Sequence, residues 1–398
     1  MSWCAVGVAR RTRRSFAASP LLQCRRLAAG EQTHGDLLDL CRRRNFLLGG
    51  QTTPPSVLGG GHGLGPLGAQ MKRNLLQKWW EATALRRDQV LPIDSLCHRP
   101  GTSDPPSPRP TIRTAPKSWL DRNTTREELE KMADLRQDLL HGALYNYLPC
   151  LELLNRKLPF GIAEVGRCFR PITDFAQVPS RFSVADHHDD AGRKISIIRY
   201  DFPWGEEPIE RISSMDDSAL TQVHHGPINS LQGRDGRKSV VPHAVWLSSD
   251  VERGLLAYLS DAMQVMESPA PQDQRRTVLK IHPLLTPVKV AVDMGRGRAA
   301  ELRLVCTRFQ VCEGLCGELR GCGISVWPGY LETLQTRMEQ LYTKYDEMGV
   351  LFTALVSDAT LESGLIQLRS RDTTIKDTMH VSKLSAFLTQ HMTAADNL

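Results

Sequence analysis

The stretch Leu351-Phe-Thr-Ala-Leu-Val356, followed after Ser363-Gly364 by Leu365-Ile-Gln-Leu-Arg369, decides the fold near the C-terminus. Apolar residues fill almost all of the first run, which is typical of a strand buried on both faces of a sheet. The Ser-Gly pair favours a turn between the two runs. The stretch therefore predicts two neighbouring strands at the centre of an α/β domain.

Outward from these strands, apolar runs alternate with amphipathic segments. The further elements predicted on either side are a strand at 288–292, a helix at 299–320, a strand at 324–327, a helix at 331–347 and a last helix at 374–390. The order β-α-β-α-β-β-α predicts a mixed, largely parallel sheet of roughly five elements, covered by helices.

The preceding part of the chain has a different pattern, in which strands follow one another without regular helices between them. Strands are predicted at 162–169, 195–200 and 240–247, and a helix follows at 250–266. A break dense in Pro and Ser lies at 98–118. We therefore expect an α/β (α+β) chain with a core at 31–266, a linker at 267–276 and a second domain at 277–398.

The N-terminus carries the positive charge of the chain. Residues 1–30 contain six Arg and no Lys, Asp or Glu, which is the composition of a mitochondrial transit peptide. The alternative is a basic tail that targets nothing. With these six removed from the 50 Lys and Arg residues, 44 remain to balance 44 acidic residues. Binding to a polyanion therefore requires a local patch of positive charge.

The densest local patch is Gly233-Arg-Asp-Gly-Arg-Lys-Ser239, where glycines flank the cations Arg234, Arg237 and Lys238. Glycines allow a phosphate to approach the backbone, and cations bind it. Arg193-Lys194 and Arg42-Arg43-Arg44 are weaker patches of the same kind. The alternative for each is an exposed turn with solvated charges.

No cofactor or metal is predicted. The four cysteines between Cys306 and Cys322 fall on a helical apolar stripe, where Cys behaves as a small hydrophobic residue. The cluster Asp186-His-His-Asp-Asp190 reads as a solvated loop, in which adjacent side chains diverge. No apolar run reaches the roughly 18 residues that a membrane span requires.

Several motifs together resemble class II aminoacyl-tRNA synthetases of the glycyl and prolyl type. Leu158-Pro-Phe-Gly-Ile-Ala-Glu-Val-Gly-Arg-Cys-Phe-Arg170 is similar to the second motif of that class, and Asp250-Val-Glu-Arg253 is similar to the third. Residues 276–398 resemble the anticodon-binding domain of class IIa enzymes. The resemblance implies an antiparallel synthetase-like sheet followed by an anticodon-binding-like α/β domain.

The departures from this pattern imply that catalysis is lost, so no catalytic residue is predicted. Arg170 matches the arginine that contacts the ATP phosphate, but Ile172 stands where the class has Glu. An aliphatic side chain cannot accept a hydrogen bond from a nucleotide. Arg253 is kept, but Ser248-Ser249-Asp250 replaces the glycine-rich turn that should admit ATP.

One family combines these features, the accessory subunits of mitochondrial DNA polymerase. The resemblance lies in residues 202–205, 233–238, 323–333 and 340–348. It implies a non-enzymatic homodimer in the mitochondrial matrix nucleoid that binds the catalytic subunit and double-stranded DNA. An active synthetase and an RNA-binding adaptor are the alternatives. The short span 171–192 and the insertion-like stretch 306–312 depart from the family and suggest an alternative transcript.

The contact with the catalytic subunit is predicted on the C-terminal domain, because interfaces favour Trp, Tyr and Arg as anchors. Arg369 and Arg371 lie two apart on one predicted strand, so they should share one face. Gly364, in the turn beside them, completes that candidate surface, and Trp327 and Tyr330 are further candidates.

Overall fold

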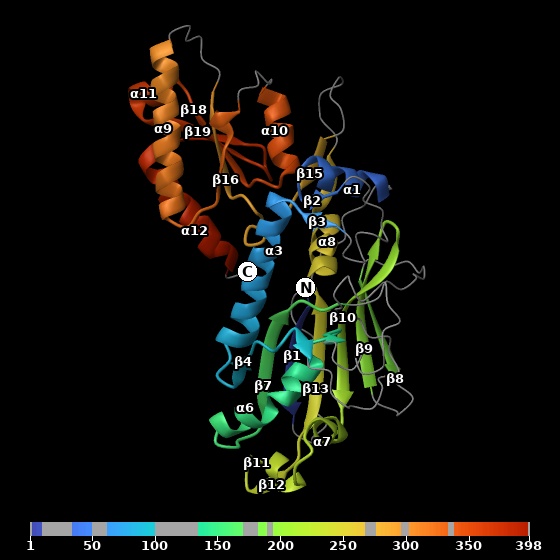
Figure 1. Cartoon of the computed structure of the whole chain (residues 1–398). Coiled ribbons are helices and arrows are strands. Elements are labelled where there is room, and N and C mark those ends of the chain that lie inside the picture. The colour runs from blue at the N-terminus through green and yellow to red at the C-terminus, as the bar shows by residue number, and fades with distance from the viewer. Residues whose placement is uncertain are drawn as a thin grey trace, which may run out of the picture. The chain divides into compact units, whose positions relative to one another are not determined.

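The structure is a computed structural model, and its described residues form two compact units (Figure 1). The first unit holds residues 2–9 and the described parts of 76–254, and the second holds the described parts of 34–49, 62–75 and 255–396. The described ranges are 2–9, 34–49, 62–99, 134–169, 182–188, 194–266, 276–295, 302–332 and 338–396. Within these ranges, no helix has the length and apolar character needed to cross a membrane.

The first unit contains a seven-stranded sheet that is antiparallel except at one edge, where β4 runs parallel to β7. Its strands, in spatial order, are β4 (Val90–Pro92), β7 (Phe160–Gly166), β1 (Ser2–Ala9), β13 (His243–Asp250), β10 (Gly205–Met215), β9 (Lys194–Phe202) and β8 (Phe182–His188). The antiparallel sheet agrees with the architecture predicted for the core.

Strand β1 comes from the segment predicted to direct import. It lies antiparallel between β7 and β13, with Val6 opposite Ile162 on one side and Trp246 on the other. Removal of this segment would therefore take a strand from the middle of the sheet, which the composition of a transit peptide does not predict. The remainder of the predicted leader, from residue 10 onward, lies outside the described residues.

Short helices cover part of the first sheet and close its core. Tyr147 and Leu151 pack with Leu220, Leu231 and Phe160 in one apolar cluster. The elements involved are α5 (Leu140–Tyr145), α6 (Tyr147–Leu153), α7 (Ser218–Val223) and the 3-10 turn η4 (Ile228–Leu231). The smaller elements of the unit are the π-turn η2 (Glu81–Leu85) and the strand pairs β5 (His98–Arg99) with β6 (Asp134–Leu135) and β11 (Gly233–Asp235) with β12 (Lys238–Val240).

The second unit contains the mixed five-stranded sheet. Its strands, in spatial order, are β17 (Val326–Pro328), β16 (Val290–Met294), β18 (Phe352–Val356), β19 (Leu365–Ser370) and β20 (Lys376–His380). Strands β17, β16 and β18 are parallel to one another. Strand β19 pairs antiparallel with β18, and β20 pairs antiparallel with β19. Every residue of β18 is buried, as its apolar run predicts for a central strand.

Helices pack on this sheet through the stripe that the sequence indicated. In α9 (Leu302–Gly321), Cys312, Cys316 and Leu319 are buried in the core. Burial raises the pKa of the Cys312 thiol to about 12, so the group stays a neutral core residue. The other helices and turns of this unit are α1 (His34–Arg43), η5 (Gly329–Leu331), α10 (Met338–Glu347), α11 (Asp358–Ser363), η6 (Val381–Lys383) and α12 (Leu384–Asp396). Its strand pairs are β2 (Leu47–Leu48) with β3 (Gly63–Leu64), and β14 (Met263–Met266) with β15 (Arg276–Leu279). The helices α3 (Pro66–Trp80) and α8 (Val251–Ala262) each have residues in both units.

Several elements differ from prediction. The helix predicted at 250–266 ends at Ala262, where β14 begins, and residues 186–188, predicted to lie in a loop, belong to β8. The helix predicted at 374–390 is wrong over its first ten residues, because Lys376–His380 forms the edge strand β20 and the α-helix begins only at Leu384. The direct turn predicted at Ser363-Gly364 is instead the end of α11, whose start is capped by Ser357. The 267–276 boundary also differs, because 34–49, 62–75 and 255–266 belong to the second unit.

Candidate functional site

The basic stretch predicted to bind nucleic acid forms the hairpin β11–β12. Asp235 pairs with Lys238, so Gly236 and Arg237 make the turn, and Gly236 has the left-handed φ of +64° that favours glycine. Arg237 and Lys238 are exposed and have no polar partner among the residues that the structure describes. Arg234 is also exposed, but its Nη2 donates to the carbonyl of Asn155 at 2.8 Å. The hairpin thus presents two free cations and one tethered one.

Arg156 fixes this hairpin to the rest of the first unit. Its guanidinium donates to the carbonyl oxygens of Ser230 at 2.6 Å and Gln232 at 2.7 Å, and it pairs with Glu152 at 2.9 Å. The backbone N–H of Arg234 donates in turn to the carbonyl of Arg156 at 2.6 Å. No local pattern predicts this role, because Arg156 and the carbonyl groups that it binds are more than 70 positions apart in the chain.

Lys157 adds a fourth cation that the sequence reading missed. Its backbone forms a bridge with Arg234, and its side chain is exposed with no polar partner within the described part of the chain. The basic hairpin surface therefore consists of Lys157, Arg234, Arg237 and Lys238. Three of its four charges are available to a polyanion, which fits the backbone of a nucleic acid.

The described residues of the weaker basic patches pair with carboxylates of the same chain, although Lys194 remains exposed. Lys194 pairs across the β8–β9 hairpin with Asp186 at 2.8 Å, and with the Ser196 hydroxyl it holds the pKa of the Asp186 carboxyl below its usual range. Arg193 lies outside the described residues. Arg43 and Arg44 both bind the Glu347 carboxylate, at 3.0 and 2.6 Å. Arg44 is therefore a structural contact of the second unit and not a phosphate site.

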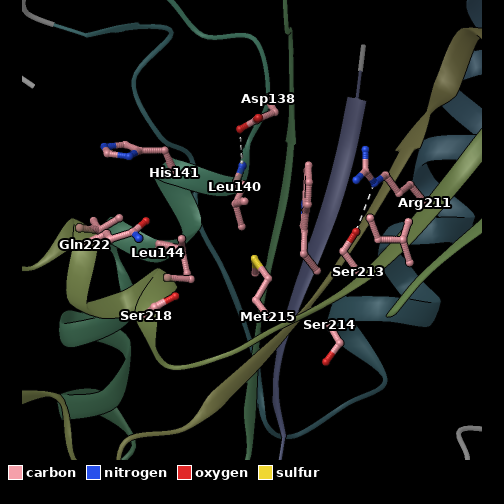
Figure 2. Close-up of a pocket in the computed structure, with 14 residues that line it drawn as sticks. Asp138, Leu140, His141, Leu144, Arg211, Ser213, Ser214, Met215, Ser218 and Gln222 are labelled. Carbon is pink, nitrogen blue, oxygen red and sulfur yellow. Dashed lines mark hydrogen bonds between the residues drawn. The ribbon is translucent and has the colours of Figure 1, made fainter. Parts of the chain in front are cut away.

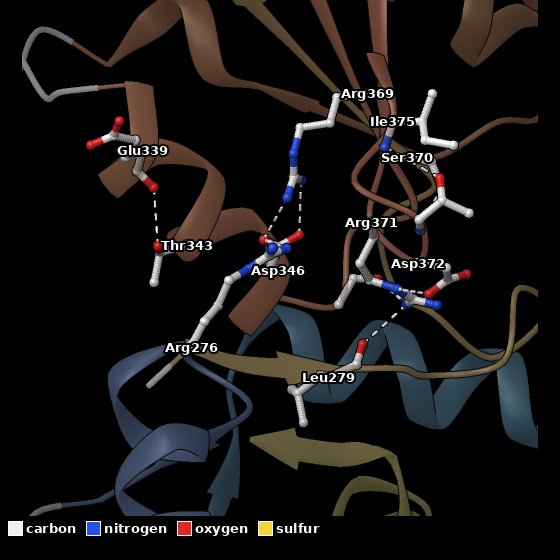
Figure 3. A network of polar contacts seen from close by, with 12 residues as sticks. Arg276, Leu279, Glu339, Thr343, Asp346, Arg369, Ser370, Arg371, Asp372 and Ile375 are labelled. Carbon is white, nitrogen blue, oxygen red and sulfur yellow. Dashed lines mark hydrogen bonds and ion pairs between the residues drawn. The ribbon is translucent and has the colours of Figure 1, made fainter. Parts of the chain in front are cut away.

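The prediction that Arg369 offers an exposed anchor is wrong. Figure 3 shows its guanidinium turned toward Asp346 on α10, to which it donates two hydrogen bonds of 3.0 Å each. Arg276 also binds the same carboxylate, and the ring of Tyr342 lies 4.5 Å from the Arg369 guanidinium carbon. Arg369 is only 4% exposed, so it holds the domain together and is not available to a partner.

Arg371 is buried in the same way, at 2% exposure. Its Nη1 donates to the carbonyl oxygens of Leu279 and Gly349 at 3.0 Å each, and its Nε donates to Asp372 at 2.8 Å (Figure 3). The two arginines do not share one strand as predicted, because β19 ends at Ser370 and Arg371 lies in the turn that follows it. Arg369 is bound by Asp346 of α10 and Arg371 by the carbonyl of Leu279 in β15, and single-strand periodicity cannot reveal such contacts.

The remaining partner candidates divide between core and surface. Tyr330 is 8% exposed and packs edge-to-face on Phe309 at 4.9 Å, so it belongs to the core. Gly364 ends α11 with a φ of +70°, and a Cβ there would meet the His380 ring at 2.4 Å. Trp327 is half-buried on the edge strand β17 and is therefore the candidate whose side chain remains partly accessible to a partner.

Trp327 is held in place by two charged neighbours. Its Nε1 donates to the Glu332 carboxylate at 2.9 Å, and the Lys344 ammonium, which also binds Glu332, lies 5.7 Å from the ring centroid. Leu331 beside it is 54% exposed. Trp is one of the residue types that most often anchor an interface, so Trp327 is the stronger candidate and Leu331 contributes exposed apolar surface.

The remnant of the third synthetase motif is occupied by internal contacts. Arg253 lies 3.4 Å from the Glu207 carboxylate and 3.3 Å from the carbonyl of Pro208. Burial raises the pKa of Glu207, and the nearby positive charge of Arg253 partly offsets that effect. Asp250 accepts hydrogen bonds from the first backbone N–H groups of α8. Arg170 and Ile172, of the second motif, lie outside the described residues.

A pocket of about 380 Å³ lies between α5 and α7 and the strands β9, β10 and β13 (Figure 2). Most polar groups that line it have partners within the chain. Arg211 donates to Ser213, the carboxylate of Asp138 accepts from the backbone of Leu140, and Ser218 binds Asp216. Across the described ranges, no three His, Cys, Asp or Glu side chains gather as a metal site would require.

Comparison with known proteins confirms both predicted resemblances. Residues 289–391 match the family model of the anticodon binding domain, within the predicted span 276–398. Over 90% of the chain, a glycine–tRNA ligase of Thermus thermophilus is 22% identical and is covered over 98% of its own length.

Higher identity is found with a different class of protein. The mitochondrial DNA polymerase subunit gamma-2 of Xenopus laevis is 49% identical over 414 residues, which cover 91% of this chain and 88% of the relative. DNA polymerase subunit gamma-2 of Bos taurus is 41% identical, over 93% of this chain and 88% of that protein.

Proposed function

Because the chain belongs to the DNA polymerase subunit gamma-2 family, we propose that it is a non-catalytic accessory subunit of a mitochondrial DNA polymerase. In this role it binds the catalytic subunit and double-stranded DNA, raises processivity, and supports mitochondrial DNA replication in the matrix nucleoid. It acts as a homodimer and needs no cofactor.

The basic hairpin surface is the observation that carries the DNA-binding part of this proposal. Lys157, Arg237 and Lys238 are the free cations of the basic hairpin surface, and Arg156 holds the hairpin in place through its hydrogen bonds. A fixed cluster of cations binds phosphates without reading the bases. This suits a subunit that must accept any sequence of the DNA being copied.

The contacts around Arg253 support the absence of adenylation. Catalysis by preorganised charge needs cations that are aimed at the developing charge of the reaction. Arg253 instead lies against Glu207 and Pro208 within its own domain. An active synthetase, the alternative function, would show ATP–pyrophosphate exchange with an amino acid. We expect no exchange.

The contact with the catalytic subunit is proposed at Trp327 and Leu331. The burial of Arg369 and Arg371 moves the contact away from those residues but keeps it on the C-terminal domain. A Trp327→Ala/Leu331→Ala variant should capture less catalytic subunit than the wild type. The matched control is Leu365→Ala, which removes an exposed leucine from another strand of the same sheet. Equal capture by all three proteins would remove this surface from the proposal.

DNA binding is tested by salt dependence. Each phosphate neutralised contributes about −0.9 to the slope of log K against log salt. The Arg234→Ala/Arg237→Ala/Lys238→Ala variant should have a shallower slope by about 2 to 3 on duplex DNA. Arg320→Ala/Lys383→Ala, which removes two exposed cations of the other unit, should leave the slope unchanged. An unchanged slope in the triple variant would refute the hairpin assignment, and tighter binding to RNA would favour the RNA-binding adaptor.

A further inference from the structure

An exposed aromatic pair lies in the same unit as the basic hairpin. Tyr145, at the end of α5, is 64% exposed although it is a large ring. The ring of His224, just after α7, lies nearly parallel to it, with centroids 6.4 Å apart and planes inclined by 16°. The pair is not part of the apolar core, and no polar partner of Tyr145 is found among the described residues.

The neighbours of this pair hold it in place. The Nε2 of His224 is 2.9 Å from the carbonyl oxygen of Leu144, which fixes the plane of the imidazole. The ring of Tyr147 packs against His224 from another side, at 6.4 Å and 57°. Tyr145 directly follows the buried Leu144, so its backbone is anchored as well. Little conformational freedom remains to be lost when a flat ligand stacks on the pair.

The aromatic pair and the basic hairpin surface are linked through one buried apolar cluster of the first unit. The hydroxyl of Tyr147 donates to the carbonyl of Leu231 at 2.9 Å, just before β11 begins. Leu144, Tyr147, Leu220 and Leu231 belong to one buried cluster. Arg156 adds the hydrogen bonds that hold the hairpin to the segment after α6. A ligand that contacts both features therefore meets a fixed arrangement.

We propose that Tyr145 and His224 form a stacking platform for an unpaired base of DNA whose backbone is bound by the basic hairpin surface. Aromatic rings with flanking cations are the combination that binds single-stranded nucleic acid, because every base has a face that can stack. Within a duplex these faces are covered by neighbouring bases. The preferred ligand is therefore a junction at which duplex DNA continues into a single strand. This deepens the proposed function and rests on it.

The test compares three fluorescent DNA probes by anisotropy: a blunt duplex, the same duplex with a 5′ single-stranded extension, and the single strand alone. The wild type should bind the extended duplex more tightly than the blunt one. Tyr145→Ala should weaken binding to the extended duplex about tenfold, and leave binding to the blunt duplex unchanged. Tyr145→Phe keeps the stacking ring and should behave as the wild type.

The matched control is Leu153→Ala, because Leu153 is a similarly exposed apolar residue on α6. An unchanged ratio of extended to blunt affinity in Tyr145→Ala would overturn the platform, and so would equal losses on both probes. A variant that keeps the ratio but captures less catalytic subunit would make the surface a protein interface and also overturn the proposal. Failure of the DNA-binding function itself would be recognised separately, by absent binding of the wild type to every probe.

Discussion

At the scale of single residues, arginines of the same charge have opposite roles in this chain. Arg369 and Arg371 are buried and neutralised by internal partners, whereas Arg237 is exposed and has no polar partner in the described ranges. The sequence places all three beside glycine or serine in polar stretches. Their roles differ because of the elements packed over them, which no local pattern encodes.

Arg369→Ala should destabilise the second unit. It removes two hydrogen bonds from Asp346, whose side chain is 1% exposed and which then keeps Arg276 as its ionic partner. Breaking a buried ion pair costs about 3 to 5 kcal/mol of unfolding free energy. Because Arg276 still pairs with Asp346, we expect a loss near the lower end, about 3 kcal/mol. Urea unfolding measures it. A loss below about 0.5 kcal/mol, the range of ordinary surface substitutions, would contradict the structural role.

Asp293 should make the stability of the second unit depend on pH. Burial raises the pKa of this carboxyl above its ordinary value of 3.8, and the hydroxyl of Tyr345, which donates to it at 2.6 Å, opposes the shift. A group with a raised folded pKa contributes stability that is present at low pH and is lost as pH rises through that pKa.

The wild type should therefore lose stability relative to Asp293→Asn as pH rises above the ordinary pKa of the carboxyl, 3.8. The asparagine cannot ionise, yet its oxygen still accepts a hydrogen bond from Tyr345. Unfolding measured as a function of pH gives the difference. A constant difference between the two proteins would show that Asp293 ionises alike in the folded and unfolded states.

At the scale of elements, the β11–β12 hairpin depends on residues outside itself. A two-stranded hairpin is at best marginally stable alone in water. Here Arg156 donates to two carbonyl oxygens on the segment that leads into β11.

Arg156→Ala should loosen the hairpin and lower stability by about 1 to 3 kcal/mol, because carbonyl groups lose charged donors. Amide hydrogen exchange should speed up at residues 233–240. Glu152→Ala removes only the ion pair to Arg156 and serves as the control. Exchange in Arg156→Ala as slow as in the control would contradict the clamp.

The sequence predicts the buried elements well and the edge elements poorly. The largely apolar run of β18 and the helical stripe of α9 are where the periodicity places them. The edge strand β20 carries Lys, Asp, Thr and His. This polar composition lacks the apolar pattern of a buried strand, so the sequence predicts the start of a helix there. The cations Arg234, Arg237 and Lys238 could be picked out because they are adjacent, but Lys157 joins them only through a tertiary bridge.

At the scale of the whole molecule, both units have architectures that the synthetase resemblance predicts. The second unit contains the anticodon-binding region, and the first a largely antiparallel sheet. The place of β1 within that sheet could not be predicted, because an Arg-rich leader composition says nothing about strand pairing. The family could be predicted because its motifs lie in residues 202–205, 233–238, 323–333 and 340–348, whereas the loss of catalysis inferred from the residues at the ATP-binding motifs stays a prediction.

The central claim is that this chain supports a DNA polymerase without performing chemistry of its own. The most direct measurement is the length of product made in a single binding event by the catalytic subunit of mitochondrial DNA polymerase, on a primed template with excess competitor DNA, with and without this chain. The account predicts longer products when the chain is present, and shorter ones again when Arg234, Arg237 and Lys238 are replaced by Ala. Products of unchanged length with the wild-type chain would contradict it.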